Sequence, residues 1–350
     1  MHIFAPDIGI DLGSSNTQVY VKKRGIVISE PTLVVVSGTS TRIVQDVGDE
    51  ARRMLGRTND SRTIIRPIRN GAIADFDMTT LLLKYFMRKA IGVSHLVAPK
   101  VVISVPAGLD DVNRKAITEA VRSAGAKKVY LVEKPFAAAL GSNLPVYDPI
   151  GSMVVDIGGG TTDAAVVSLG GLVVSQSIPV GGAKMDEAII NHIKREFNML
   201  IGDRTAEDVK IDLASAMPMD EARSVRIRGR DLLSPQAMDI EYTSRQAYMA
   251  VHEPCRAIVA AIRWVLERTP PELAADIMRT GIHLTGRVAQ LYAMDQYIAT
   301  ELGIPVLIAK EPGDCTALGL GYIVENMAML QEQGHMPRQA YRFRQNANAF

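Results

Sequence analysis

Two stretches decide the fold: DLGSSNT at residues 11–17 and DIGGGTT at residues 156–162. Each begins with an aspartate, has a glycine two positions later and continues with small and hydroxyl residues. The two stretches start 145 positions apart (156 − 11). Apolar residues of strand character precede and follow both, which predicts a strand, a tight turn and a second strand in each. We interpret the repetition as a duplicated domain.

A tight turn of small residues exposes several backbone N–H groups on one side, and such a surface binds phosphate oxygens. Either turn alone is typical of a plain hairpin. Two such turns in register, facing each other, would clamp one polyphosphate. Asp11 and Asp156 stand at the strand end before each turn. They could hold Mg²⁺ through water, because Mg²⁺ prefers oxygen ligands and keeps part of its hydration shell.

The composition and length indicate a globular protein of about two domains and argue against several functional classes. The 350 residues include 39 Lys and Arg against 38 Asp and Glu, and without a long basic run this balance argues against nucleic acid as a partner. The length suits about two domains. Cys255 and Cys315 lack zinc-site spacing, which indicates buried thiols in a reducing compartment. No apolar run approaches the ~18 residues of a membrane span, and residues 1–6 are too short for a signal peptide, so we expect a cytoplasmic protein.

Periodicity predicts helices interleaved with strands, a pattern typical of mixed sheets with helices packed on them. Two stretches, 29–66 and 202–244, look like insertions into this pattern. The tail at 331–350 is polar, with arginines among aromatic residues, and we expect it to be poorly ordered. The predicted helices are 79–91, 112–124, 184–198, 253–268 and 272–278, and the later strands are 100–105 and 281–284.

Beyond the two turns, several segments resemble MreB, the bacterial actin, a member of the superfamily of actin, heat-shock chaperones and sugar kinases. The resemblance is collinear and spans about residues 7–327. The matching segments are GRT at 56–58, RPI at 66–68, GAIADF at 71–76, VPAG at 105–108, GSMVVD at 151–156 and IGDRTAE at 201–207.

The resemblance implies an actin-like α/β fold, in which two duplicated α/β domains with mixed sheets flanked by helices surround a nucleotide cleft. Each domain then carries a smaller inserted subdomain. The first domain would comprise residues 1–28, 67–150 and 311–330 with the insertion 29–66, and the second would comprise 151–184 and 245–310 with the insertion 185–244, followed by the tail 331–350.

The family's biology supplies further expectations. Members bind ATP and Mg²⁺ and polymerise with copies of themselves. Their filaments lie on the inner face of the cell membrane, where they organise cell-wall synthesis with the elongation machinery and set rod shape. By resemblance we expect the same partners here, and a paralogue could co-polymerise.

Site residues follow from the resemblance, position by position. The two turns would contact phosphates, Thr161 would help hold the attacking water, and a later segment would bind ribose and base, although a glutamate is usual at position 212. The third turn normally has more glycines, so Arg287 would pair with a phosphate, crowd the pocket or point outward. The nucleotide contacts are thus Ser14, Ser15, Asn16, Gly158, Gly159, Gly160, Glu207, Lys210, Asp212, Gly286, Arg287 and Val288.

The most consequential departure from the family is Lys134, which stands where relatives have the glutamate that orients the hydrolytic water. An ammonium donates hydrogen bonds but accepts none, and loss of a positioned base typically costs about 10²–10⁴ in rate. Lys134 could instead pair with the γ-phosphate. Glu133 is one residue early and on a helix would point about 100° away. We therefore predict a nucleotide-binding homologue with slow or absent hydrolysis.

The sequence also allows two interpretations of the segment at 96–97 and two alternative functions. Leu96 and Val97 match an apolar loop that some relatives insert into lipid, but they could equally begin a buried strand; as a membrane contact they would need filament avidity. An active filament ATPase is the first alternative function. A sugar-kinase-like phosphotransferase is the second, and it would need a carboxylate base in the cleft.

Overall fold

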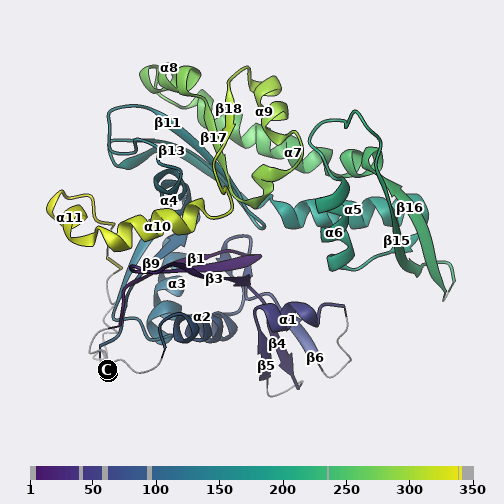
Figure 1. The fold of residues 1–350 in the computed structure, drawn as a ribbon, viewed down its shortest axis with the longest axis horizontal. Helices are drawn as coiled ribbons and strands as arrows, with labels where there is room; N and C mark the ends of the chain where they lie inside the picture. Colours follow the sequence, from purple (N-terminus) through teal and green to yellow (C-terminus); the bar gives the residue numbers. More distant parts are fainter. Residues whose placement is uncertain are drawn as a thin grey trace, which may run out of the picture.

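Two five-stranded sheets form the centre of the protein in a computed structural model that describes residues 5–38, 42–56, 62–92, 97–234, 236–337 and 339–340 (Figure 1). The first sheet has the order β10-β9-β1-β2-β3 and the second has the order β13-β12-β11-β17-β18. The strands of the first are β1 (Ile8–Leu12), β2 (Asn16–Val21), β3 (Gly25–Pro31), β9 (Lys100–Val105) and β10 (Lys128–Glu133); those of the second are β11 (Ser152–Ile157), β12 (Thr162–Ser168), β13 (Gly171–Ile178), β17 (Ile282–Thr285) and β18 (Val306–Ile308).

The two sheets have the same construction. In the first, β1 pairs antiparallel with β2 and parallel with β9, and in the second β11 pairs antiparallel with β12 and parallel with β17. Each glycine-rich turn therefore joins the central strand of its sheet to the antiparallel neighbour. The predicted duplication is confirmed, and mixed sheets flanked by helices give the α/β class expected from the sequence.

Helices follow the strands in matching order. Side-chain caps define where several begin: Asp75 accepts from the Met78 N–H at the start of α2, and Thr243 forms a capping box with Gln246 at the start of α7. Because of that cap, α7 begins at Ser244 rather than at the predicted residue 253. The helices on the two sheets are α2 (Phe76–Ile91), α3 (Asp111–Ser123), α4 (Lys134–Gly141), α7 (Ser244–Glu267), α8 (Pro271–Thr280), α9 (Met294–Leu302), α10 (Cys315–Glu325) and α11 (Met327–Glu332).

Two small sheets stand apart from the central ones, both toward the right of Figure 1. The first lies with helix α1 and the second with helices α5 and α6. The predicted boundaries at 29 and 185 fall inside β3 and α5. We therefore propose that the first insertion starts after Pro31 and the second at Gly182, and we keep the other ranges as a proposal. Their elements are α1 (Asp49–Arg53), β4 (Val34–Ser37), β5 (Ile43–Val47), β6 (Arg62–Ile65), α5 (Gly182–Phe197), α6 (Asp203–Leu213), β14 (Met199–Leu200), β15 (Ser224–Asp231) and β16 (Ala237–Thr243); the short pair β7 (Ile68–Arg69) and β8 (Ala72–Ile73) precedes α2.

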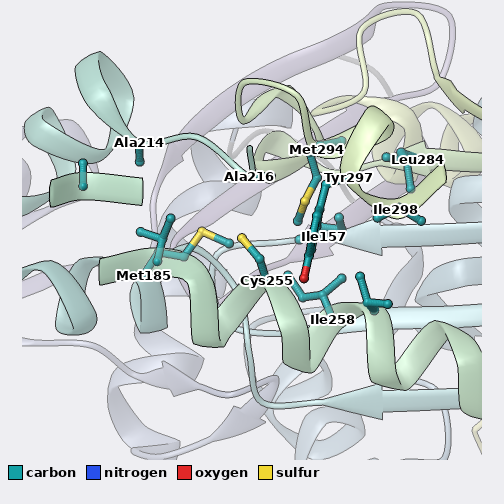
Figure 2. Packing of buried hydrophobic residues seen from close by; sticks show 14 of the residues in the cluster. Ile157, Met185, Ala214, Ala216, Cys255, Ile258, Leu284, Met294, Tyr297 and Ile298 are labelled. Atoms are coloured by element: carbon teal, nitrogen blue, oxygen red, sulfur yellow. The ribbon is translucent and has the colours of Figure 1, made fainter. Parts of the chain in front are cut away.

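A large apolar cluster fills the second half, beneath α7. Figure 2 shows Met185 of α5 next to Cys255 of α7, with Tyr297 and Ile157 on the other side of the thiol. Cys255 and Cys315 are both buried and free, and burial raises the pKa of each thiol to about 12. The prediction of ordinary buried thiols is confirmed. No helix in the described ranges combines the length and the apolar character of a membrane span.

The part of the predicted tail that the structure describes contacts the rest of the protein, and poor order of the tail stays a prediction. The Ala340 N–H donates to the Val129 carbonyl (3.0 Å), and Gln339 bridges to Tyr130 at the edge of the first sheet. The His335 ring lies 4.6 Å from the ring of Tyr147. The remaining tail residues, 338 and 341–350, lie outside the described ranges.

Helices α4 and α10 join the two halves. They lie against each other between the two sheets, with α10 on β1 and β2 and α4 on β11 and β12 (Figure 1). Two glycines allow the close approach: a Cβ on Gly319 would overlap the Ala137 carbonyl oxygen, and a Cβ on Gly141 would overlap the Cys315 carbonyl oxygen. The distance between the two halves therefore depends on the absence of side chains at Gly141 and Gly319, where the two helices cross.

Replacing Gly319 by alanine should destabilise the fold, because a methyl group there meets backbone rather than a movable side chain. Overpacked interiors typically lose about 1–3 kcal/mol. We expect the Gly319→Ala protein to unfold at a lower urea concentration than the wild type. Gly171→Ala is the matched control, because a Cβ at Gly171 has no neighbour within 4 Å. Equal midpoints for all three proteins would contradict the close crossing.

Candidate functional site

One cavity opens between the two halves, and both glycine-rich turns line it. The residues predicted from the sequence to contact nucleotide or metal come together there from distant parts of the chain, along with Thr161 and Lys134. These lining residues are Asp11, Ser14, Ser15, Asn16, Lys134, Asp156, Gly158, Gly159, Gly160, Thr161, Glu207, Lys210, Asp212, Gly286, Arg287 and Val288.

The two turns have the same internal geometry. The Gly13 N–H donates to the Asn16 carbonyl (3.1 Å), and the Gly158 N–H donates to the Thr161 carbonyl (2.9 Å). The turns also touch across the cavity, since a Cβ on Gly159 would overlap the Ser15 hydroxyl. Glycine at this position therefore permits close approach of the two halves, as the sequence pattern predicts.

The aspartates that precede the turns are held by matching hydroxyls. Ser104, at the end of β9, donates to Asp11 Oδ1 (2.6 Å), and Thr285, at the end of β17, lies 3.0 Å from Asp156 Oδ1. Both carboxylates are buried, so each needs such a partner. Sequence reasoning missed Ser104 and Thr285. The two residues occupy equivalent positions at the ends of β9 and β17, the strands that pair in parallel with β1 and β11. This equivalence can be recognised only when the strand pairing is known.

Lys134 lies between the two aspartates. Its Nζ atom is 3.3 Å from Asp156 Oδ2 and 3.8 Å from Asp11 Oδ1, and 13% of its side chain is exposed. Burial by itself lowers the pKa of the Lys134 ammonium, but the carboxylates of Asp11, Asp156 and Asp163 outweigh burial and hold the pKa above its ordinary value. The amine is therefore a permanent cation in the cleft, and it accepts no hydrogen bond from water.

Thr161 is positioned by a buried carboxylate behind it. Its hydroxyl donates to Asp163 Oδ2 (2.9 Å), and the Ala107 N–H donates to Asp163 Oδ1 (3.2 Å). Burial raises the pKa of Asp163, and the Lys134 ammonium opposes part of that increase. Because the Thr161 proton is directed to Asp163, the lone pairs of the Thr161 oxygen remain available to the cavity. This arrangement suits the predicted role of holding a water.

Helix α6 supplies the far wall. Lys210 Nζ pairs with Asp186 (2.8 Å) and lies 3.3 Å from the Gly182 carbonyl, so its ammonium is held beside the second turn. Burial raises the pKa of Asp186, and Lys210 opposes that shift. Glu207 on the same helix pairs with Arg52 of the first insertion (3.1 Å).

A second ion pair also joins α6 to the first half. Arg66 Nη2 lies 3.2 Å from Asp203 Oδ2, so α6 is joined to the first half at two points. These pairs connect segments on opposite sides of the cavity.

Arg287 does not point outward. Its Nη2 donates to the Ser29 hydroxyl on β3 (3.0 Å), so the side chain spans the cavity from one half to the other. Gly286, the glycine that this turn retains, has a φ of 83°, and a Cβ there would overlap the Ile157 carbonyl oxygen. The missing glycines thus place a guanidinium at the cavity wall, where it closes one side.

Two sequence-based candidates lie elsewhere. Glu133 ends β10 and pairs with Arg114 (2.8 Å), and it does not line the cavity, so it is wrong as a group that positions water there. Leu96 lies outside the described residues. Val97 is half-buried and precedes β9, which begins only at Lys100; its carbonyl accepts from the Ala5 N–H (3.0 Å). Val97 thus makes a β-bridge three residues before that strand, and its contact with a membrane stays a prediction.

Comparison with known sequences agrees with this geometry. A family model described as MreB/Mbl protein matches residues 5–332. The chain is 46% identical over 331 residues to the cell shape-determining protein Mbl of Bacillus subtilis, covering 95% of this chain and 99% of that protein. It is 44% identical over 331 residues to the cell shape-determining protein MreB of Escherichia coli, covering 93% and 95%.

Solved structures agree as well. MreB5 of Spiroplasma citri bound to ADP is similar with a TM-score of 0.87 and 33% identity, over 94% of this chain and 98% of that one. MreB5 bound to AMPPNP has a TM-score of 0.88 and 33% identity, over 94% and 99%. The MamK double helical filament, at 20% identity and a TM-score of 0.75 over 91% and 98%, shows the fold alone.

Removing the Lys134 charge should destabilise the protein without added ligand, because two buried carboxylates would then lose their cation. Breaking a buried ion pair from one side typically costs about 3–5 kcal/mol. We expect Lys134→Met to lower the urea midpoint well below that of Lys84→Met, the control on the exposed face of α2. A Lys134→Met protein as stable as the control would show that Asp11 and Asp156 do not depend on the ammonium.

Proposed function

The chain belongs to the MreB/Mbl family, and from this premise we propose that it is an actin-like cytoskeletal protein that binds ATP in its cleft, polymerises and takes part in determining cell shape. The observation that carries the proposal is the pair of glycine-rich turns that face each other across one cavity. The similar MreB5 structures were crystallised with ADP and with AMPPNP, which favours an adenine nucleotide.

The cavity has chemically distinct ends that suit such a ligand. Backbone N–H groups and the hydroxyls of Ser14 and Ser15 surround the position between the turns, which suits phosphates. Glu207 and Asp212 on α6 offer acceptors for ribose hydroxyls at the opposite end. We assign the triphosphate to the turns and the nucleoside to α6.

Magnesium fits less well. The resemblance expects Asp11 and Asp156 to hold Mg²⁺ through water, but a fixed ammonium lies within 4 Å of both carboxylates. A divalent cation would have to share them with that charge, and like charges at such a distance repel. We therefore assign no step to a metal ion.

We propose that hydrolysis is slow. Thr161, backed by Asp163, is proposed to help hold the water, but the acceptor that would orient it from α4 is replaced by a donor at Lys134. An active filament ATPase would need another acceptor in the cleft. The sugar-kinase-like alternative has no specific support, because the buried carboxylates at the turns already have partners: Asp11 and Asp156 face Lys134, and Asp163 accepts from Thr161 and Ala107.

Phosphate release separates these alternatives. With ATP present, the wild type should release little phosphate, and Lys134→Glu should raise the rate, by up to about 10²-fold if the new carboxylate orients the water. Measurements should use equal protein concentrations, with nucleotide binding checked in both proteins. Fast release by the wild type, unchanged in Lys134→Glu, would support the active ATPase instead. Stimulation of ATP consumption by a sugar would support a kinase.

The filaments are proposed to lie in the cytoplasm on the inner face of the cell membrane, where they would cooperate with the cell-wall elongation machinery and with any paralogue. A basic hollow next to Val97 suits an anionic lipid surface: Lys22, Arg24, Lys100 and Lys127 line it together with Asp7 as the acidic member. Residues of this kind near a membrane attract anionic lipids.

Reversing two of these charges should weaken membrane binding. The double variant Lys22→Glu and Lys127→Glu is expected to lose at least about 1 kcal/mol of binding per basic residue removed. Co-sedimentation with vesicles containing phosphatidylglycerol measures the effect, and vesicles of phosphatidylcholine alone should bind neither protein. Lys84→Glu combined with Lys194→Glu makes the same change in net charge at exposed positions of α2 and α5 and is the control. Unchanged binding of the double variant would remove this hollow from the proposed membrane face.

A further inference from the structure

Lys134 reaches the centre of the cleft because of the element that carries it. It is the first residue of α4, directly after β10, and Pro135 follows it in the first turn of the helix. The crossing of α4 with α10 holds this helix between the two sheets. The ammonium is therefore presented by a rigid element to both halves at once.

The two carboxylates that face the ammonium are fixed in orientation. Asp11 and Asp156 each direct one oxygen at a strand-end hydroxyl, from Ser104 and Thr285. Asp156 is 2% exposed, and its Oδ2 atom has no hydrogen-bond partner among the described residues. That oxygen lies 3.3 Å from Lys134 Nζ, so the ammonium balances its charge.

The same ammonium also faces the place assigned to the phosphates. Lys134 lines the cavity, and a Cβ added to Gly158 in the second turn would lie 3.5 Å from Lys134 Nζ. An ammonium donates in several directions and interacts with phosphate as a point charge. Lys134 can therefore bridge the aspartates of both halves and a phosphate oxygen, as a metal ion with water ligands would.

We propose that the Lys134 ammonium takes the place of a divalent metal between Asp11 and Asp156, so that the cleft holds the triphosphate of ATP without Mg²⁺. This inference rests on the proposed nucleotide binding and adds to it the absence of a metal requirement. Unlike a metal ion, the ammonium is attached to α4, so it stays when the nucleotide leaves. One positive charge is therefore present between the turns whether or not ATP is bound.

Calorimetric titration of ATP into the purified full-length protein tests this, in excess Mg²⁺ and in excess EDTA. The wild type should bind ATP with dissociation constants that differ by less than about threefold between the two conditions, whereas Lys134→Glu should lose about tenfold or more in EDTA. Lys84→Glu makes the same charge change on exposed α2 and should behave like the wild type. A tenfold loss by the wild type in EDTA would overturn the inference while leaving nucleotide binding intact. No binding by the wild type in either condition would overturn both.

A second measurement does not depend on ATP. Titration with Mn²⁺ alone should show no binding at this site in the wild type and binding in Lys134→Glu, because the substitution replaces the tethered cation with a third carboxylate. Lys134→Met removes the cation without adding a carboxylate, so it provides a second comparison. The ATP titration described above, in which the wild type is measured in Mg²⁺ and in EDTA, needs no variant. The inference would be contradicted if the wild type bound Mn²⁺ tightly and if Lys84→Glu and Lys134→Arg bound it equally well.

Discussion

The close crossing of α4 and α10 is the constraint on which the rest of the structure depends. Gly141 and Gly319 allow the two helix backbones to touch, and an added methyl group at either would meet a carbonyl oxygen of the other helix. Each sheet packs on one of these helices, so the crossing determines how far apart the sheets lie. That separation brings the two glycine-rich turns into contact at Ser15 and Gly159.

The duplication accounts for most of the residues that line the cleft, and Lys134 is an exception because it has no counterpart in the other half. Asp11 with Ser104 and Asp156 with Thr285 are equivalent pairs in the two sheets. A single residue, at the start of α4 alone, contacts both members of this arrangement. An internal repeat with one shared cation holds its halves together electrostatically. The ion pairs of α6 with Arg52 and Arg66 add connections at the rim, although exposed pairs of this kind contribute little each.

These features bear on what a member of the MreB/Mbl family can do. In some clefts the charge is balanced by a metal ion that accompanies the nucleotide. The net charge of such a cleft changes when the nucleotide is cleaved and leaves. Here one positive charge between Asp11 and Asp156 belongs to the chain, so it stays when the nucleotide leaves.

The sequence by itself determined the repeat, the position of both turns, the residues that line the cavity and the importance of Lys134, because these depend on local patterns of small, hydroxyl and charged residues. It did not reveal Ser104 and Thr285, whose role depends on which strands are neighbours. It also left Arg287 and Glu133 open, since one spans the cleft to Ser29 and the other turns away to Arg114. Only the tertiary structure decided these cases, because hydrogen bonds and ion pairs act over a few ångströms in space, and residues far apart in the chain reach that distance only when α4 and α10 bring the two halves together.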